Sequence, residues 1–556
     1  MPGVDSNVLR CKQKNKDTGF TNAERQSYGL VARLPARVET LHDQIARCSA
    51  QYSILEKPIE KWLYLTRLQE TNQTLFSSFC LEHLKEVLPI VYTPTVGLAC
   101  KTYSGIWQGL PHGFYLNRAH LGRVRSILDQ WPHTPRIIVC TDGTRILGLG
   151  DLGTGGHQIC VGKLTLYSLG GGFAPEETLP ISFDFGCDVP EIRDHPFYLG
   201  LREPRNKDAD YYNLIAETIS AVHNKWPDCV YQFEDFSNDT AFKLLEKHRE
   251  NGPVFNDDIQ GTGCIAAATL ASAVRSCSIR MGRDVHASDQ IYVMYGAGAG
   301  GIGVAESIAR LSVDEGKTLE EARRQFYIVD SQGLITTDRS DYVNKTIASH
   351  KLPYARSDMS CEGMKTLLDV VKKVKPTCLL GLSTIPKSFN EEILTTLCEG
   401  TTQDPIVFAL SNPTEKCECT AEECMKYTKG RALYASGSPM PPVVLPDGKV
   451  IQTAQCNNFY VFPGIGLGAY ACRAKKITDE MIGGVARALA AMVDEKALAR
   501  GELLPDISLI REVSCHCALG FIRVAETQNL VRKQLPTQDS EVISMLRGMQ
   551  WVPKYE

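Results

Sequence analysis

Short apolar runs alternate with longer stretches that place apolar residues at helical spacing, from about residue 135 onward. The runs have the length of buried strands, and most of them end in small or polar residues. The predicted strands are 137–140, 146–148, 181–184, 229–233, 254–255, 291–295, 326–329, 377–383 and 405–412. The alternation predicts an α/β fold with a doubly wound parallel sheet.

The first part of the chain has a helical pattern instead. Over residues 22–88, apolar side chains recur at roughly helical spacing. The helix is expected to end at Leu88, because Pro89 disfavours the helical conformation in the residue before it. An extended piece over residues 90–94 should follow and hold Tyr92 at a defined edge.

Composition describes an ordinary globular protein of 556 residues, 43% hydrophobic and 22% charged, with a formal net charge of −4. That charge argues against a general nucleic-acid binder, which normally carries a basic stripe. No apolar run reaches the roughly 18 residues needed to cross a bilayer, so no membrane partner is expected. The 20 scattered cysteines follow no secretory signal, which indicates reduced intracellular thiols. Cys417, Cys419 and Cys424 lack a nearby fourth ligand and do not favour a zinc site.

Two pairs of acidic residues follow apolar runs: Glu234 with Asp235, and Asp257 with Asp258 before a glycine-bracketed turn. Neighbouring side chains of a strand point to opposite faces, so Glu234 and Asp235 share one ion only if the chain turns out of the strand there. All-oxygen ligation suits Mg²⁺ or Mn²⁺ rather than zinc. On spacing alone, acidic residues that cap solvated strand ends are an equal alternative.

Two glycine-rich turns match the dinucleotide pattern G-x-G-x-x-G, which has meaning only between a strand and a helix. The match at Gly148–Gly153 is rejected, because more loop follows it. Gly296, Gly298 and Gly301 stand between a strand-like run and a helix-like stretch, where they would allow a tight turn, close approach to a pyrophosphate and close packing. They predict a Rossmann-type dinucleotide site rather than a turn without ligand, and Asp330 at the end of the next strand would meet the adenosine ribose.

Three asparagines lie next to other apolar runs and are candidates for ligand binding. Asn412 ends the run at 405–412 and would look into the ligand crevice at the carboxyl ends of the strands. Asn457 and Asn458 precede another apolar run, and an ordinary turn role is an equal alternative for either pair of polar residues.

The longest ordered motifs are VYTPTVG (91–97), DGTRILGLGDLG (142–153), QFEDF (232–236), FNDDIQGT (255–262), ALSNPT (409–414) and NNFYVFPG (457–464). Together they resemble the signature blocks of malic enzyme, and the resemblance extends from about residue 20 to residue 522. It implies oxidative decarboxylation of L-malate to pyruvate and CO₂ with a nicotinamide cofactor and a divalent metal, Mg²⁺ or Mn²⁺.

The resemblance also implies roles for individual residues. Tyr92 resembles the general acid, Lys163 the general base and Arg145 the clamp for a substrate carboxylate. The implied metal ligands are Glu234, Asp235 and Asp258, with Asp257 as their partner. Asn412 and Asn458 resemble the amides that orient malate. The cofactor-binding set would be Gly296, Gly298, Gly301, Asp330, Ser331, Arg339, Lys345, Asn412 and Asn457.

The implied chemistry explains why these residue types are needed. A base removes the proton of the malate hydroxyl as hydride leaves to the nicotinamide, and Lys163 can do so only when neutral, a form that burial favours. A metal ion lowers the pKa of that hydroxyl and stabilises the enolate left by loss of CO₂. Tyr92 would then protonate the enol carbon. From the residues alone, a surface Lys163 and a core Tyr92 are the alternatives.

Two arguments about the cofactor disagree. Asp330 would repel a 2′-phosphate and by itself favours NAD. NADP-dependent members of the family, however, tend to have serine after this aspartate and a lysine about fifteen positions later. The chain has Ser331, with Arg339 and Lys345 downstream, but departs from the pattern at Gln332. NADP is therefore expected, with Ser331 and Lys345 or Arg339 as its phosphate contacts, and NAD is the alternative.

The motifs divide the chain into four expected parts. These are a helical N-terminal domain (1–110), a substrate and metal α/β domain (111–256, completed by about 458–530), a dinucleotide-binding domain (257–457) and a C-terminal tail (531–556). The helical opening resembles the animal and protist form, usually a tetramer, so a homotetramer or homodimer is expected. The basic N-terminus lacks a clear transit-peptide pattern, which favours the cytoplasm over the mitochondrion.

Two other functions remain as alternatives. A malolactic enzyme or a simple NAD-dependent 2-hydroxy-acid dehydrogenase would share the glycine loop and the hydride step. A non-catalytic dinucleotide-sensing module would need neither a metal nor a proton shuttle, and the presence of Tyr92, Lys163 and three carboxylates argues against it.

Overall fold

The computed structural model describes residues 6–108 and 112–556, and the chain forms two compact units. The first unit contains residues 1–236 and 547–556, and the second contains residues 237–546. The finer division into four domains remains a prediction.

The first unit opens with helices, as its pattern predicts. Its helices are α1 (Asn22–Ser27), α2 (Leu41–Ile54), α3 (Pro58–Thr71), α4 (Gln73–Glu82), α5 (Leu84–Val91), α6 (Thr95–Ile106), α7 (Val124–Leu128), α8 (His157–Leu166), α9 (Pro190–Arg193) and α10 (Ala209–Lys225). The expected end at Leu88 is wrong: α5 continues through Pro89 to Val91, and the Tyr92 amide still donates to the Leu88 carbonyl at 3.0 Å. Burial of Ile90 and Val91 outweighs the one backbone hydrogen bond that a proline removes.

The strands of the first unit are β1 (Phe114–Leu116), β2 (Ile137–Thr141), β3 (Thr178–Phe183) and β4 (Val230–Phe233). They pair in parallel in the order β1-β3-β2-β4. The run at 146–148 is not a strand but a turn, closed by the Ile146 amide donating to the Gly150 carbonyl at 2.9 Å. The parallel order brings the carboxyl ends of β2 and β4 to one edge of the sheet.

The second unit carries the larger sheet. Its strands are β5 (Val254–Asn256), β6 (Tyr292–Tyr295), β7 (Phe326–Asp330), β8 (Gly333–Leu334), β9 (Cys378–Gly381), β10 (Ile406–Ala409), β11 (Leu433–Ser436), β12 (Val443–Val444), β13 (Val450–Ile451) and β14 (Ala454–Gln455). Seven of them form a sheet in the order β14-β11-β10-β9-β6-β7-β8, parallel except for β8. The order reverses beside β6, as in a doubly wound fold.

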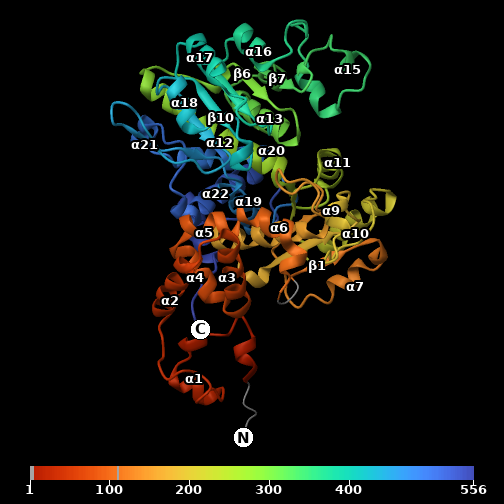
Figure 1. The fold of residues 1–556 in the computed structure, drawn as a ribbon, viewed down its shortest axis with the longest axis vertical. Helices are drawn as coiled ribbons and strands as arrows, with labels where there is room; N and C mark the ends of the chain where they lie inside the picture. Colours follow the sequence, from red (N-terminus) through yellow and green to blue (C-terminus); the bar gives the residue numbers. More distant parts are fainter. Residues whose placement is uncertain (1–5, 109–111) are drawn as a thin grey trace. The chain divides into compact units, whose positions relative to one another are not determined.

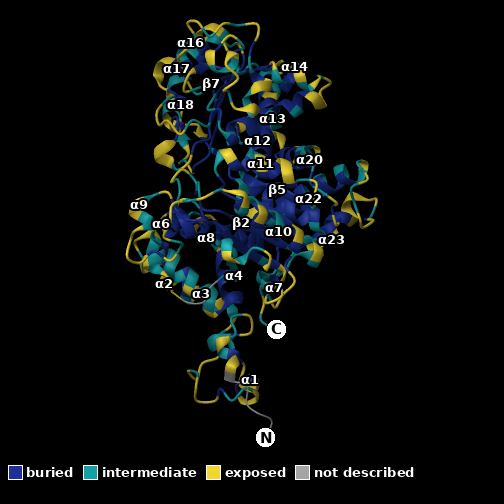
Figure 2. Ribbon diagram, turned by 90° about the vertical axis from the view of Figure 1, so that its right-hand side faces the viewer, coloured by how far each residue is buried: buried dark blue, intermediate teal, exposed yellow. Residues whose placement is uncertain are grey.

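Helices flank this sheet on both sides, and Figure 1 shows α16 to α18 opposite α12 and α13. The helices of the unit are α11 (Asn238–His248), α12 (Thr262–Met281), α13 (Ala299–Asp314), α14 (Leu319–Arg323), α15 (Ser340–Val343), α16 (Leu367–Val374), α17 (Glu391–Gly400), α18 (Ala421–Tyr427), α19 (Phe462–Ala471), α20 (Asp479–Ala491), α21 (Glu495–Arg500), α22 (Ile510–Thr527) and α23 (Asp539–Met549, whose last residues belong to the first unit). Figure 2 shows the strands buried and the exposed residues mostly in the connecting segments and on outer helix faces. The α/β fold predicted from the sequence is confirmed.

One helix of the second unit is long and apolar enough to cross a membrane. It is α12 with the π-helical turn η7 (Asp257–Gly261) before it, together 25 residues. Because 72% of its most apolar window is buried inside the protein, it is the core helix of the unit.

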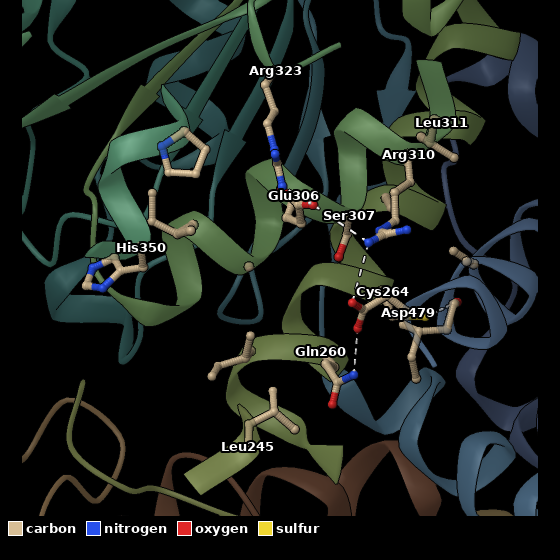
Figure 3. Close-up of a pocket in the computed structure, with 18 of the residues that line it drawn as sticks. Leu245, Gln260, Cys264, Glu306, Ser307, Arg310, Leu311, Arg323, His350 and Asp479 are labelled. Carbon is tan, nitrogen blue, oxygen red and sulfur yellow. Dashed lines mark hydrogen bonds and ion pairs between the residues drawn. The ribbon is translucent and has the colours of Figure 1, made fainter. Parts of the chain in front are cut away.

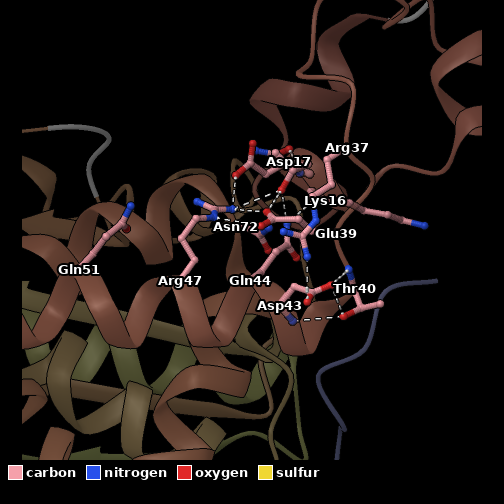
Figure 4. A network of polar contacts seen from close by, with 12 residues as sticks. Lys16, Asp17, Arg37, Glu39, Thr40, Asp43, Gln44, Arg47, Gln51 and Asn72 are labelled. Carbon is pink, nitrogen blue, oxygen red and sulfur yellow. Dashed lines mark hydrogen bonds and ion pairs between the residues drawn. The ribbon is translucent and has the colours of Figure 1, made fainter.

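A polar network anchors the N-terminal segment of the first unit to α2 (Figure 4). Arg47 pairs with Glu39 at 2.7 Å and with Asp17 at 3.6 Å. The Gln44 amide donates to the Lys16 carbonyl at 2.9 Å, and its oxygen accepts from the Tyr555 hydroxyl at 2.7 Å. The hydrogen bond between Tyr555 and Gln44 thereby joins residues more than 500 positions apart in the sequence.

Candidate active site

Lys163 lies on α8 and is 1% exposed, so the core of the first unit surrounds it. Its Nζ is 2.9 Å from Oε1 of Glu234, which is equally buried after the end of β4. The same Nζ lies 4.9 Å from the ring centre of Tyr92, the residue that ends α5. The structure thus brings together the residues expected to be the base, the acid and one metal ligand, and the alternative of a surface Lys163 is wrong.

Neighbouring residues fix the Glu234 carboxylate in its place. Its Oε2 accepts a hydrogen bond from Gln232 at 2.8 Å, and the Gln232 oxygen accepts one from the Tyr167 hydroxyl. Both Gln232 and Tyr167 are fully buried. A carboxylate oriented in this way loses little conformational entropy when it binds a ligand.

The chain leaves β4 by a turn, as ion binding by two consecutive carboxylates requires. Asp235 adopts a left-handed conformation with a φ of 55°, which redirects its side chain relative to Glu234. Its Oδ2 accepts from the Leu147 amide at 3.0 Å, and its carbonyl accepts from the Arg145 amide at 3.3 Å. The loop that carries Arg145 is therefore joined to the acidic turn.

A buried ion pair holds the rest of that loop. Arg205 Nη2 lies 2.7 Å from Asp151 Oδ1, and Arg205 Nη1 donates to the Asp142 carbonyl at 2.9 Å. Burial raises the pKa of Asp151, but the hydrogen bonds and charge of Arg205 outweigh this effect, so the pKa is lowered. The glycine-rich stretch Gly148–Gly153 is thus part of a clamped loop that leads through a 3₁₀ turn into α8. The expected loop after this stretch is wrong, because a 3₁₀ turn and then α8 follow it directly. Its rejection as a dinucleotide turn remains a prediction.

The second acidic pair lies on η7 in the second unit. Asp257 is fully buried, and its Oδ2 accepts from Asn458 Nδ2 at 2.8 Å. Asp258 beside it is half-buried. Asn256 caps the turn, because its side-chain oxygen accepts from the Ile259 amide at 2.9 Å. Asn458 therefore contacts the acidic turn, while Asn457 caps the short helix that begins at Asn458.

The glycine loop between β6 and α13 has the predicted geometry. Gly296 has a φ of 116°, and a Cβ there would lie 2.4 Å from the Leu382 carbonyl oxygen. A Cβ on Gly301 would lie 2.2 Å from the Gly296 oxygen, so this glycine permits the close packing. Gly298 starts α13, and the Ala299 amide donates to Asn238 Oδ1 at 3.2 Å. Asn238 is a contact of this loop that sequence reasoning missed.

Asp330 ends β7 as predicted, but two cations already contact it. Arg339 Nη1 lies 2.8 Å from its Oδ1 and Lys351 Nζ 2.9 Å from its Oδ2. Burial raises the pKa of Asp330, yet the hydrogen bonds from Arg339 and Lys351 outweigh it and hold the pKa below its ordinary value. Arg339 also pairs with Asp341 at 2.7 Å and is 4% exposed. Ser331 and Lys345 are exposed, and Lys351 was not anticipated.

Asn412 is exposed three positions after the end of β10, and its Oδ1 accepts from Ser438 at 3.2 Å. The buried carboxylate of Glu418 supports this region. Glu418 accepts from the amide and hydroxyl of Ser383 at 2.9 and 3.0 Å, and from those of Ser411 at 3.3 and 2.5 Å. It thereby ties together the residues that follow β9 and β10, beside Asn412.

Comparison with known proteins assigns the family. The family description "Malic enzyme, N-terminal domain" matches residues 69–249, and "Malic enzyme, NAD binding domain" matches residues 259–526. The chain belongs to the malic enzyme family. It is 42% identical to the NADP-dependent malic enzyme of Dictyostelium discoideum, over 100% of this chain and 99% of that protein. It is 39% identical to the human NADP-dependent malic enzyme over 99% and 93% of the two chains.

Other malic enzymes extend the comparison. The NAD-dependent malic enzyme of Shewanella denitrificans is 38% identical over 100% of this chain and 97% of its own. The crystal structure of the Entamoeba histolytica malic enzyme, at 21% identity, has a TM-score of 0.58 and covers 94% of this chain and 91% of that one, which supports the fold. Membership of the malic enzyme family identifies a nicotinamide-dependent oxidoreductase that oxidatively decarboxylates malate.

Proposed function

We propose that this malic enzyme converts L-malate to pyruvate and CO₂ with NADP as the preferred cofactor and Mg²⁺ or Mn²⁺ as the metal. The observation that carries the proposal is the buried contact of Lys163 with Glu234 at 2.9 Å beside the Tyr92 ring. A buried lysine, carboxylate and tyrosine at one place supply a base, a metal ligand and an acid.

The donor set fits a hard divalent cation. Glu234, Asp235 and Asp258 offer carboxylate oxygens, and no cysteine or histidine belongs to the set. When bound, such a cation would lower the pKa of the malate hydroxyl and stabilise negative charge on that oxygen. The proposal requires ligands from both compact units to bind the same ion.

Lys163 has to be unprotonated to accept the hydroxyl proton, and the contact with Glu234 favours its protonated form. A Glu234 carboxylate shared with a cation would bind the ammonium less strongly, which frees Lys163 for the proton transfer. Arg145 would hold a carboxylate of malate, and Asn412 and Asn458 would orient it. Tyr92 lies close to Lys163 and would protonate the enol carbon. Lys163, protonated in the first step, would then return a proton to the Tyr92 oxygen.

The cofactor preference rests on the surroundings of Asp330. Because Arg339 and Lys351 already pair with it, Asp330 repels a 2′-phosphate less than an isolated carboxylate would. Arg339 lies as close to Asp330 as Lys351 does, but Asp341 also engages it and it is only 4% exposed. Lys351 is 22% exposed, and Ser331 directly follows Asp330 in the sequence. We therefore assign the 2′-phosphate to Ser331 and Lys351, with Lys345 as a further contact.

The test is to mix protein, malate and Mn²⁺ with either cofactor, and to follow the reduced nicotinamide together with pyruvate. Reduced nicotinamide and pyruvate formed in equal amounts, with a higher kcat/KM for NADP than for NAD, support the proposal. Reduced cofactor without pyruvate indicates a simple dehydrogenase, and a higher kcat/KM for NAD overturns the cofactor assignment. Lys351→Gln should lower the preference for NADP at least tenfold, while Lys365→Gln, an exposed lysine of the same unit, should not.

We also propose a homotetramer or homodimer in the cytoplasm, and the oligomer is supported by the resemblance of the helical opening to the animal and protist form. Light scattering of the purified protein should give a mass of four or two times 61.5 kDa. A mass of 61.5 kDa at micromolar concentration contradicts the proposal.

A further inference from the structure

A cavity of about 250 Å³ lies within the second unit, behind the turn that carries Asp257 and Asp258. Its walls come from α11, η7, α12, α13, α20 and the 3₁₀ turn η9 (Ser349–Tyr354). Figure 3 shows side chains from these elements around a common space. Much of the lining is aliphatic and comes from Leu245, Ile259, Ala267, Ile302, Leu311, Ile482 and Ala486. Apolar cavities of about 150 Å³ already bind benzene, so this one has room for a larger guest.

The charged residues of the wall are already paired. Arg249 lies 2.9 Å from Asp479, Arg323 2.8 Å from Glu306, and Arg310 2.7 Å from Glu480 outside the cavity. The remaining carboxylate, Asp314, pairs with Arg487. A charged guest would find no free counter-ion among these residues and would lose its hydration, so the cavity favours an uncharged guest.

Two aromatic rings in the cavity lining offer a flat surface to a guest. The rings of Phe242 and His350 stack there with their centres 4.8 Å apart and their planes 14° from parallel. Burial lowers the pKa of His350, so its ring is neutral near pH 7. The Ser307 hydroxyl, on the α13 side, supplies a polar group that can bond one polar atom of the guest.

The cavity wall is connected to the turn that holds Asp258. Gln260 on η7 accepts from the Asn256 amide at 3.1 Å and donates to Asp479 on α20 at 2.8 Å. Gln260 therefore joins the turn that carries Asp257 and Asp258 to α20, on the side of the turn that faces the cavity. The helix that starts at the glycine loop touches the same turn, because a Cβ on Gly303 of α13 would lie 2.5 Å from the Ile259 carbonyl oxygen. A guest in the cavity would contact η7 and α13 together.

We propose that this cavity binds a small uncharged molecule of one or two flat rings, and that its occupancy changes the affinity for the divalent cation and the dinucleotide. The second half rests on the proposed function, whereas the binding itself does not. If metal and dinucleotide change the affinity of the protein for the guest, the guest changes the affinity for these ligands by the same factor.

Indole, which is uncharged and has two fused rings, is a suitable probe. Its dissociation constant is measured by ligand-observed NMR, and its position is located in a crystal of the full chain soaked with it. We expect indole in this cavity, and at least tenfold weaker binding of the anion indole-3-carboxylate. A soaked crystal with indole elsewhere, or equal affinity for the two probes, overturns the proposed site.

A variant with a larger side chain in the cavity tests the proposed binding site. Ala486→Leu places extra carbons in the space and should weaken indole binding at least tenfold. Ala491→Leu, the same change at an exposed position of the same helix, should leave it unchanged. If Ala486→Leu does not fold, Gly483→Leu replaces it, because its Cβ would approach only Arg487 Nη1, at 3.4 Å. An unchanged dissociation constant in a folded variant overturns the site.

Coupling is tested by repeating the indole titration with saturating Mn²⁺ and NADP. We expect a change of at least threefold with both ligands present. With Mn²⁺ alone, the change in indole affinity should equal the change in Mn²⁺ affinity that electron paramagnetic resonance measures when indole is added. Equal indole affinity with and without these ligands overturns the regulatory half. If the wild-type protein binds no Mn²⁺ but still binds indole in the cavity, the proposed function fails and the binding site stands.

Discussion

At the scale of single residues, the chemistry depends on Lys163 being both buried and able to lose its proton. Its position on α8 places the amine 2.9 Å from Glu234, and the turn after β4 keeps that carboxylate in place. The residue type and the family motif identified Lys163, but the sequence could not show its contact with Glu234, which is 71 positions away, because that contact requires the sheet to form. Lys351 was missed for a similar reason: its contact with Asp330 joins residues 21 positions apart, and β8 and α15 lie between them.

We predict that Lys163→Ala lowers kcat at least about 100-fold, the usual scale for loss of a general base. The malate KM should change much less, because Lys163 makes the proton transfer rather than the main substrate contacts. Steady-state kinetics at saturating Mn²⁺ measures both. Lys225→Ala, a surface lysine of the same unit that pairs with Asp129, is the matched control. A loss confined to KM would remove Lys163 from the proton path.

At the scale of elements, most strands of both sheets followed from the alternation of apolar runs and polar ends, but β1, β8, β11 and β14 were not predicted. Two predictions were wrong: the helix end at Leu88, near Tyr92, and the strand at 146–148, near Arg145. The helix continued through Pro89 because packing outweighed local propensity, and the run at 146–148 became a turn because Asp235 and Gly150 accept its backbone hydrogen bonds. Both errors lie where contacts distant in sequence decide the local structure.

The loop after β2 depends on the buried pair of Arg205 with Asp151. We predict that Asp151→Asn destabilises the protein by about 3 kcal/mol at pH 7, the lower end of the range for breaking a buried ion pair. Because the pKa of folded Asp151 is lowered, its contribution is present above the unfolded value near 4 and is lost as the pH falls through the folded value. Urea unfolding of both proteins from pH 7 to pH 3.5 should show a shrinking difference. A difference independent of pH would show that the carboxylate charge is not what stabilises the loop.

Glu418 joins the ends of β9 and β10 through Ser383 and Ser411. Glu418→Gln replaces one accepting oxygen by an NH₂ group that faces donors, which we predict to cost about 1–3 kcal/mol of unfolding free energy. The cofactor dissociation constant should rise several-fold, because the residues after both strands border the dinucleotide crevice. Calorimetry and fluorescence titration measure the two quantities. Glu415→Gln, an exposed change in the same loop, should alter neither.

At the scale of the whole molecule, the proposed metal ligands come from both compact units: Glu234 and Asp235 from the first, Asp258 from the second. The seven-stranded sheet belongs to the second unit, and each unit has buried core residues. An ion that binds the native protein but not the unfolded chain raises the free energy of unfolding.

We therefore predict that Mn²⁺ raises the free energy of unfolding by about 2.7 kcal/mol at 100 times its dissociation constant, the amount that one-site binding to the native state requires. Asp258→Asn should abolish this gain while it leaves the stability without metal nearly unchanged, because Asp258 is half-buried. Asp447→Asn, an exposed change in a turn of the same unit, should keep the full gain. Thermal unfolding with and without Mn²⁺ measures the effect in all three proteins without any turnover. Since an ion held by the first unit alone would stabilise Asp258→Asn as much as the wild type, an undiminished gain in that variant would exclude Asp258 as a ligand.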